Sequence, residues 1–273
     1  MTGPSLETEL ARAHELDVGE LADAIESIGF DCTRCGACCK GYETCGDDIE
    51  DDECETDASD GDRVEGDTGR EPHTATVFPD EVRRLLDATN DATHATNDDR
   101  DGSDDRSVEE SVDEDRREPY DWRDIARPMP YGLTDGPDGP TGETFEWALQ
   151  TTACGDCTFY RETDGQGNCT VHESRPLVCQ TYPFSVALGG TSQPMGEPVG
   201  REGIVRAHEC EGLGRDISRE DAEALAAALK RRAVRELEEA IGVRNNYRPT
   251  DVDGVVVHDS EGQKRPDGTT LDG

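Results

Sequence analysis

The sequence has few lysines, few aromatic residues and no long hydrophobic run. Among its 273 residues only Lys40, Lys230 and Lys264 are lysines, and acidic residues outnumber Lys and Arg by 64 to 27. Proteins bind the nucleic-acid backbone through Lys and Arg side chains that displace counterions, so the net charge of −37 argues against a nucleic-acid partner. Hydrophobic residues make up 32% of the chain and aromatic residues 5%, so only part of it can form a core.

The lack of hydrophobic runs also argues against a membrane partner and against export. No window approaches the roughly 18 apolar residues of a membrane span. The start, Met1–Glu7, has neither the basic nor the apolar region of an export signal. We therefore expect a cytoplasmic protein. High Asp and Glu content with scarce lysine is typical of halophilic proteins, whose charges are screened over a few ångströms by salt.

Cysteine, in contrast, is abundant. Eleven cysteines in a cytoplasmic chain favour metal ligation or redox chemistry over structural disulfides, and an odd number cannot all pair. Four of them lie within eight residues, in the run Cys32-Thr-Arg-Cys35-Gly-Ala-Cys38-Cys39. Thiolates bind zinc, copper(I) and iron–sulfur clusters, and a Cys-x2-Cys pair brings two thiolates to one tetrahedral centre. Buried cysteines can also act as small hydrophobic residues, but Thr, Arg, Gly and Lys surround these. The run therefore predicts a metal site.

The doublet at the end of this run constrains the kind of site. Adjacent side chains generally point apart, so we do not expect Cys38 and Cys39 to bind one mononuclear ion together. The doublet favours either a multinuclear cluster or two neighbouring centres.

Four further cysteines lie downstream in short characteristic strings. These are Cys157-Thr-Phe-Tyr160, Cys169-Thr-Val-His172, Arg175-Pro-Leu-Val-Cys179 with Tyr182-Pro-Phe184 after it, and Cys210-Glu-Gly212-Leu-Gly214. Together with the opening run and in this order, they resemble the motifs of the YkgJ-like cysteine-cluster family, the CxxCxxCC zinc- or iron-chelating domain. The resemblance covers about Asp31–Asp216 without the acidic insertions, and it is to a haloarchaeal-type acidic member. Tyr160 and His172 stand where the family usually has Leu and Tyr.

The resemblance implies a metal-binding protein that holds Zn²⁺ or an iron–sulfur cluster such as 4Fe–4S. It implies no established reaction, and it leaves any protein partner unknown. Eight thiolates could serve two four-ligand centres. The implied ligands are Cys32, Cys35, Cys38, Cys39, Cys157, Cys169, Cys179 and Cys210.

Two other functions compete with this one. Bacterial flagellin lysine N-methylases share the cysteine motif, which makes a cluster-dependent protein lysine methyltransferase the alternative. Those enzymes are longer, however, and the chain has no glycine-rich fingerprint that would hold S-adenosylmethionine. An adaptor whose acidic arms bind a basic partner is the third function, and salt screening weakens it.

The residues near the expected ligands have simpler interpretations. We expect Cys154 to be an additional thiol near the site, and we expect Cys45 and Cys54 to be spectators in an acidic segment. His172 and His208 are expected to lie behind the ligands or at the surface rather than to bind metal. Arg175 is expected to balance thiolate charge, and Tyr182-Pro-Phe184 to pack over the cluster as a hydrophobic lid.

The predicted fold class is α+β: a small, irregular, cysteine-rich and metal-stapled domain with N- and C-terminal helices and long disordered acidic insertions. Helical periodicity covers Leu6–Ile28 with a break near Asp17, and a C-terminal helix is expected from Ser218 to a stop at Gly242. Residues 43–71 hold fourteen acidic residues and residues 91–117 hold eleven, too polar for a core. The expected segments are 1–42 (helices and CxxCxxCC loop), 43–72 (disordered insertion), 73–90 (strand–helix island), 91–117 (disordered insertion), 118–245 (remainder of the domain) and 246–273 (flexible tail).

Overall fold

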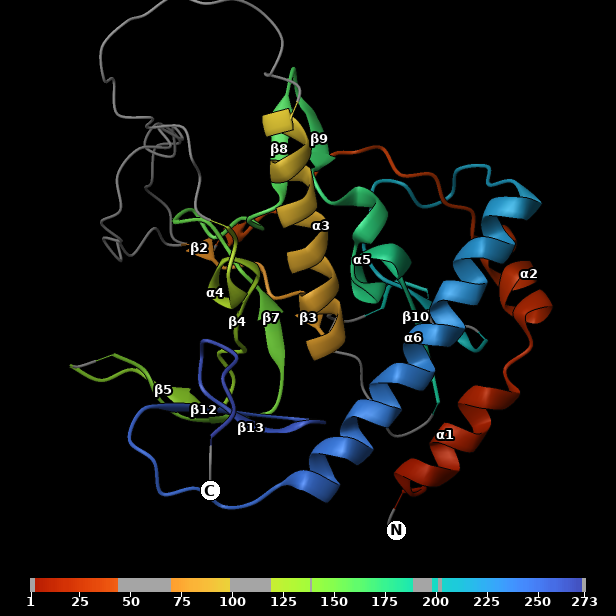
Figure 1. Ribbon diagram of the computed structural model, residues 1–273. Coiled ribbons are helices and arrows are strands. Elements are labelled where there is room, and N and C mark those ends of the chain that lie inside the picture. The colour runs from red at the N-terminus through yellow and green to blue at the C-terminus, as the bar shows by residue number, and fades with distance from the viewer. Residues whose placement is uncertain are drawn as a thin grey trace, which may run out of the picture.

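The computed structural model describes residues 3–43, 70–98, 119–137, 139–188, 198–200 and 203–271. The acidic segments 43–72 and 91–117 lie for the most part outside these ranges. The fold is α+β, as predicted, with helices around several small sheets (Figure 1). The helices are α1 (Leu6–Glu15), α2 (Val18–Ile28), α3 (Pro79–Asp98), α4 (Trp122–Ile125), the 3-10 turn η1 (His172–Ser174), α5 (Leu177–Thr181) and α6 (Arg219–Asn246).

Side-chain caps fix where the three helices of the first core begin. Ser5 accepts a hydrogen bond from the backbone N–H of Thr8 at the start of α1, and Asp17 accepts one from Glu20 at the start of α2. The predicted break near Asp17 is therefore the N-cap of a second helix. Ser218 caps α6 as predicted, accepting from Asp221 N–H at 3.1 Å.

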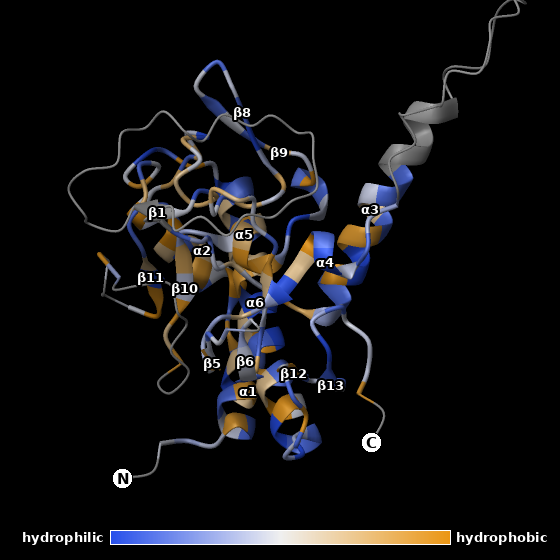
Figure 2. Ribbon diagram, turned by 90° about the vertical axis from the view of Figure 1, so that its left-hand side faces the viewer, coloured by the Kyte–Doolittle hydropathy of each residue, from blue (hydrophilic) through white to orange (hydrophobic). Residues whose placement is uncertain are grey.

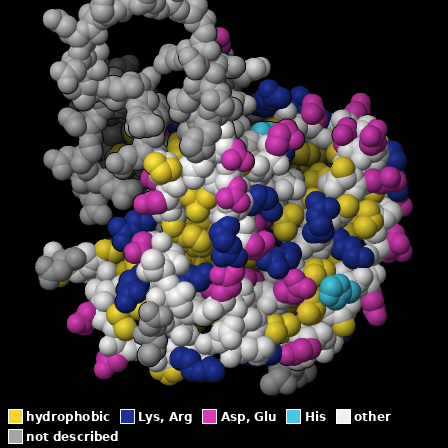
Figure 3. All heavy atoms as spheres, viewed as in Figure 1, with side chains coloured by type: hydrophobic (Ala, Val, Ile, Leu, Met, Phe, Trp, Pro, Cys, Tyr) yellow, Lys and Arg dark blue, Asp and Glu magenta, His cyan; other side chains and the backbone are white. Residues whose placement is uncertain are grey.

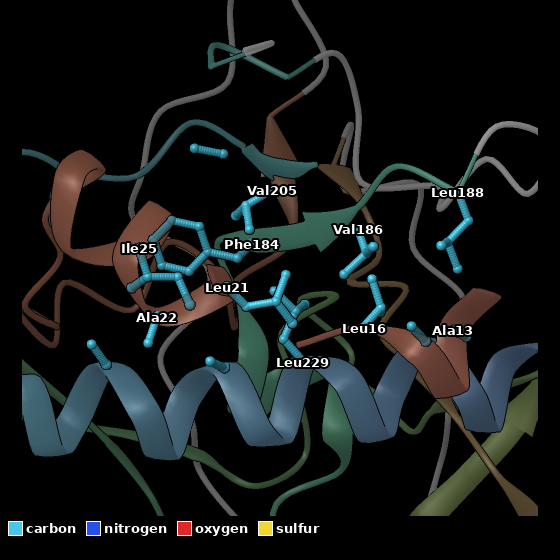
Figure 4. Close-up of a cluster of buried hydrophobic side chains, with 14 of the residues drawn as sticks. Ala13, Leu16, Leu21, Ala22, Ile25, Phe184, Val186, Leu188, Val205 and Leu229 are labelled. Carbon is cyan, nitrogen blue, oxygen red and sulfur yellow. The ribbon is translucent and has the colours of Figure 1, made fainter. Parts of the chain in front are cut away.

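Helices α1 and α2 pack against one face of α6, and the pair of strands β10 and β11 closes the same core (Figure 4). Figure 4 shows Leu21, Ile25 and Phe184 pointing toward Leu229 of α6. Each of these four side chains is at most 1% exposed. Burying an apolar side chain of this size stabilises the fold by about 1.5–3 kcal/mol.

Helix α6 continues past its predicted end. The expected stop at Gly242 is wrong, because the helix runs to Asn246. Gly242 has a packing role instead: a Cβ placed on it would stand 2.5 Å from the Cβ of Ser260. The missing side chain lets the C-terminal hairpin approach the helix.

The remaining strands form small sheets around a second core. Strands β3, β7 and β4 form an antiparallel sheet, and β13, β12, β6 and β5 form a mixed one in which β12 and β6 are parallel. Trp147 and Leu149 of β7 pack there with Ile125 and Val82. The strands are β1 (Tyr42–Glu43), β2 (Arg70–Glu71), β3 (Thr76–Val77), β4 (Ala126–Pro128), β5 (Leu133–Thr134), β6 (Thr141–Thr144), β7 (Trp147–Leu149), β8 (Tyr160–Thr163), β9 (Gln166–Cys169), β10 (Phe184–Val186), β11 (Val205–Ala207), β12 (Val255–Asp259) and β13 (Gly262–Lys264).

Two segment predictions need correction. The flexible tail at 246–273 is wrong for its central part, because β12 and β13 form a hairpin and Val256, Val257 and His258 are each at most 1% exposed. Within the segment expected as a strand–helix island at 73–90, β3 ends just before Phe78 and Pro79 stands in the first turn of α3. The helix extends to Asp98, however, eight residues into the segment expected to be disordered.

The hydropathy of the helices alternates along their length (Figure 2). Hydrophobic and hydrophilic residues follow each other at helical spacing, which produces one buried face and one exposed face. Within the described ranges, no helix is both long and apolar enough to cross a membrane.

Candidate metal centre

The cysteine loop begins where α2 ends. Gly29 closes the helix, and Asp31 N–H then donates to the carbonyl of Gly212 at 3.0 Å. A Cβ on Gly212 would stand 2.5 Å from the carbonyl oxygen of Asp31, so only glycine permits this approach. Gly212 N–H also faces the sulfur of Cys210 at 3.4 Å. The glycine of the Cys-x-Gly motif therefore brings the Cys210 loop against the start of the Cys32–Cys39 run.

A tight turn at Gly36 shapes the middle of the run. Gly36 has a φ of +79°, and its carbonyl accepts hydrogen bonds from the N–H groups of Cys39 and Lys40. The ring of Tyr160 packs directly on this turn, so that a Cβ on Gly36 would stand 2.2 Å from the Tyr160 hydroxyl. That hydroxyl donates to Glu162, which also pairs with Lys40 at 2.6 Å. Tyr160, at the position where Leu is usual in the family, therefore covers the turn.

Backbone hydrogen bonds join the run to the hairpin of β8 and β9. Cys157 N–H donates to the carbonyl of Cys39 at 2.8 Å, and Gly167 N–H donates to that of Arg34 at the same distance. The hairpin places Cys157 just before β8 and Cys169 at the end of β9. Two of the downstream cysteines are thus fixed beside the end of the run.

Cys179 reaches the site on the short helix α5. Pro176 precedes this helix and provides no side-chain cap. The carboxylate of Glu81, on α3, accepts from Leu177 N–H at 2.9 Å and from Phe78 N–H at 3.1 Å. Glu81 is 2% exposed, so one buried carboxylate serves the first turns of both α3 and α5. The position of Cys179 therefore depends on a residue almost a hundred positions earlier.

The eight expected ligands are free cysteines, and four of them, Cys39, Cys157, Cys169 and Cys179, pack in the second core. Burial and the charges of Cys169 and Cys38 raise the pKa of Cys157 to about 11. Burial and the charges of Cys157, Cys38 and Cys169 also raise the pKa of Cys179. We call Cys39, Cys157, Cys169 and Cys179 the inner group, because all four pack in the second core.

The outer group surrounds Cys210. Burial raises the pKa of its thiol first, followed by the charges of Cys38, Cys35 and Cys32. Cys32 is exposed and Cys35 half-buried, so this group lies nearer the solvent than the inner one. The charge of Cys38 contributes to the raised pKa of Cys157 in the inner group and of Cys210 in the outer group.

The doublet corrects one expectation. The sulfurs of Cys38 and Cys39 do not point apart; they lie 3.8 Å from each other. This contact raises the pKa of Cys39 and lowers that of Cys38 to about 7. Two thiolates on one tetrahedral zinc, at about 2.3 Å from the ion, are separated by about the same distance. This spacing is compatible with one shared ion and also with two adjoining centres. The positions of the other six cysteines are therefore needed to distinguish the two arrangements.

Arg175 lies where it can balance thiolate charge, as predicted. Its guanidinium donates to the carbonyl of His172 at 2.9 Å, which fixes the side chain beside α5. Its positive charge acts to lower the pKa of Cys38 and of Cys169. A cation at this place favours the thiolate form that metal binding requires.

The donor set fits zinc or iron by its chemistry. The eight free thiols come from five segments, and thiolates select these metals over magnesium or calcium. Across the part of the chain that the structure describes, no three His, Cys, Asp or Glu side chains form a set that could hold one ion.

Several neighbours differ from their expected roles. Cys154 is disulfide-bonded, so it is not an additional free thiol. Phe184 does not cover the cysteines, because it packs edge-on against Phe30 in the helical core. His172 is at the surface beside Glu173, as expected, and His208 is buried with its Nε2 2.9 Å from Ser185. The expectations for Cys45 and Cys54 fall outside the described residues.

Sequence reasoning missed Glu81 and Gly167 as parts of the site. Gly167 lies against Tyr160 and Arg34, where a Cβ would stand 2.7 Å from the ring. Glu81 follows Pro79 in the first turn of its helix, and a glutamate three residues after the cap position is a known capping pattern. That pattern could have indicated the bond to Phe78, but not the second bond to α5.

Comparison with known proteins gives one match. A family model described as "CxxCxxCC: Putative zinc- or iron-chelating domain" matches residues 31–211. The match begins at the cysteine run and ends just after Cys210, so it includes all eight free cysteines. No curated protein and no solved structure matches the chain.

Proposed function

The chain belongs to the CxxCxxCC domain family, and on that premise we propose that its eight free cysteines bind zinc or iron–sulfur clusters in two adjoining four-thiolate centres. The inner centre consists of Cys39, Cys157, Cys169 and Cys179. The outer centre consists of Cys32, Cys35, Cys38 and Cys210.

The observation that carries this proposal is how the cysteines pack. Cys39, Cys157, Cys169 and Cys179 pack in the second core. The hydrogen bond from Asp31 N–H to the Gly212 carbonyl instead brings the Cys210 loop against the start of the cysteine run. Each set has the four thiolates of one tetrahedral zinc ion or one 4Fe–4S cluster. Eight thiolates exceed what a single centre of either kind takes, which supports two.

The centres would join segments that are far apart in the sequence. The inner set connects the cysteine run, the β8–β9 hairpin and α5, and the outer set connects the run to the loop before α6. Bound zinc would supply structural cross-links, whereas a bound cluster would supply an electron-carrying group. No contact in the structure and no comparison favours the methyltransferase alternative.

Metal analysis of protein purified without oxygen tests the proposal. We expect either colourless protein with zinc, or brown protein that absorbs near roughly 400 nm, as thiolate-bound iron does. Cys35→Ser and Cys179→Ser should each lose metal. Freshly isolated protein that contains neither metal would contradict the proposal.

A further inference from the structure

A cleft with more basic than acidic side chains in its lining lies beside α5. It has a volume of about 680 Å³ and is open to solvent between α1, α3, α5 and α6. Figure 3 shows Lys and Arg side chains in the middle of this face, with hydrophobic side chains and Asp and Glu side chains among them. The chain as a whole has 64 acidic and 27 basic residues, whereas basic side chains outnumber carboxylates in the lining of the cleft.

The cations of the cleft are only partly neutralised. Arg84, Lys230, Arg231 and Arg235 line it, together with the carboxylates of Asp80 and Glu81. Asp80 pairs with Arg235 at 2.6 Å, and Glu81 pairs with Arg84 at 3.4 Å. Glu238 also lies 3.6 Å from Arg235. Lys230 donates to the carbonyl of Leu16. Neither Lys230 nor Arg231 pairs with a carboxylate within the described ranges, so the cleft keeps positive charge available.

The walls between these cations are apolar. Leu177, Ala227 and Val234 line the cleft between the charged residues. The stretch of α6 from Ala227 to Arg235 is about 12 Å long, which matches about four residues of extended peptide. Successive side chains of an extended chain point in opposite directions. In a peptide in which acidic and apolar residues alternate, the acidic side chains would therefore contact the cations and the apolar side chains would contact the apolar wall.

We propose that this cleft binds an extended peptide segment of a partner protein in which acidic and apolar residues alternate. Carboxylates make their strongest hydrogen bonds with Arg and Lys, and the exposed Arg231 is the most accessible donor here. The openness of the cleft favours a peptide lying across it over a small molecule, since small-molecule sites enclose most of their ligand. The proposal does not depend on the metal centres.

Fluorescence anisotropy with the full metal-loaded chain in about 0.15 M salt tests it. The probe is a labelled hexapeptide of alternating glutamate and leucine, and the control probe has glutamine in place of glutamate. We expect the glutamate peptide to bind and the glutamine peptide to bind at least about tenfold more weakly. Arg231→Glu should weaken binding of the glutamate peptide by about tenfold or more. Arg248→Glu, an equal charge change at an exposed residue outside the cleft, should leave it unchanged.

Metal content should be the same in both variants, because neither arginine contacts a cysteine. Equal affinity for the two peptides would overturn the proposal, and so would equal effects of the two charge reversals. Binding of inorganic phosphate that Arg231→Glu abolishes, with no peptide binding, would assign the cleft to small anions instead and would also overturn it.

Discussion

The carboxylate of Glu81 accepts a hydrogen bond from the backbone N–H of Leu177 at 2.9 Å, across 96 positions of sequence. The same carboxylate accepts from Phe78, so it connects the start of α3 with the start of the helix that carries Cys179. Burial raises the pKa of Glu81, which shows that the carboxylate is kept in a poorly solvated place for these bonds.

Replacement of Glu81 should therefore weaken both helices. Glu81→Ala leaves two buried N–H donors without an acceptor, and we expect the free energy of unfolding to fall by about 2–4 kcal/mol. Zinc affinity should fall with it, because α5 would no longer hold Cys179 in place. Urea unfolding and zinc titration provide the measurements. Asp80→Asn is the matched control at the adjacent, half-exposed position, and an equal effect there would contradict this role.

The turn at Gly36 gives a second test, with a control elsewhere in the chain. Gly36 and Gly165 both have φ near +75°, but an added Cβ would clash with Tyr160 only at Gly36. Gly165→Ala should cost only the backbone strain, about 1 kcal/mol. Gly36→Ala should cost about 2 kcal/mol more and should reduce metal content. The comparison needs thermal unfolding and metal analysis of both variants, and equal costs would show that Tyr160 does not restrict the turn.

Gly242 should behave opposite to a typical helical glycine. Gly→Ala inside a helix normally stabilises it by up to about 1 kcal/mol. Here the new Cβ would stand 2.5 Å from the Cβ of Ser260, so the hairpin of β12 and β13 would have to move. We expect Gly242→Ala to destabilise the protein, with faster hydrogen exchange in Val255–Lys264. A stabilised variant with unchanged exchange would rule out this packing role.

Acid should destabilise the fold through His73. Burial, followed by the charge of Arg127, lowers the pKa of His73 to about 4. The unfolded chain binds a proton near pH 6.5, whereas the folded one does not, so stability is lost as the pH falls from about 6.5 to about 4. At pH 5 the loss should be about 2 kcal/mol. Urea unfolding at pH 7.5 and at pH 5 measures this loss in free energy of unfolding. The loss should be smaller by about 2 kcal/mol in His73→Gln than in the wild type, and equal losses in the two proteins would show that His73 is not responsible.

Local patterns in the sequence predicted much of this fold. Ser218 marks the start of α6 and the break near Asp17 separates α1 from α2, because capping is decided within a few residues. The order of the cysteine motifs likewise indicated the family, since each motif is a short local string. The hairpin at Val255–Lys264 was missed because its polar surroundings hide a short buried strand. Glu81, Gly242 and Phe184 were missed or misread for another reason: their roles depend on partners that only the tertiary structure brings near.

The most direct test of two adjoining centres is metal counting in paired variants. Wild-type protein should contain about two zinc ions, or about eight iron atoms, per chain. Cys179→Ser should remove the inner centre and leave the outer one, whereas Cys210→Ser should do the reverse, so that each variant retains half the metal and the double variant retains none. A wild-type chain with only one zinc ion or one cluster, which either substitution alone removes completely, would contradict the division into two centres.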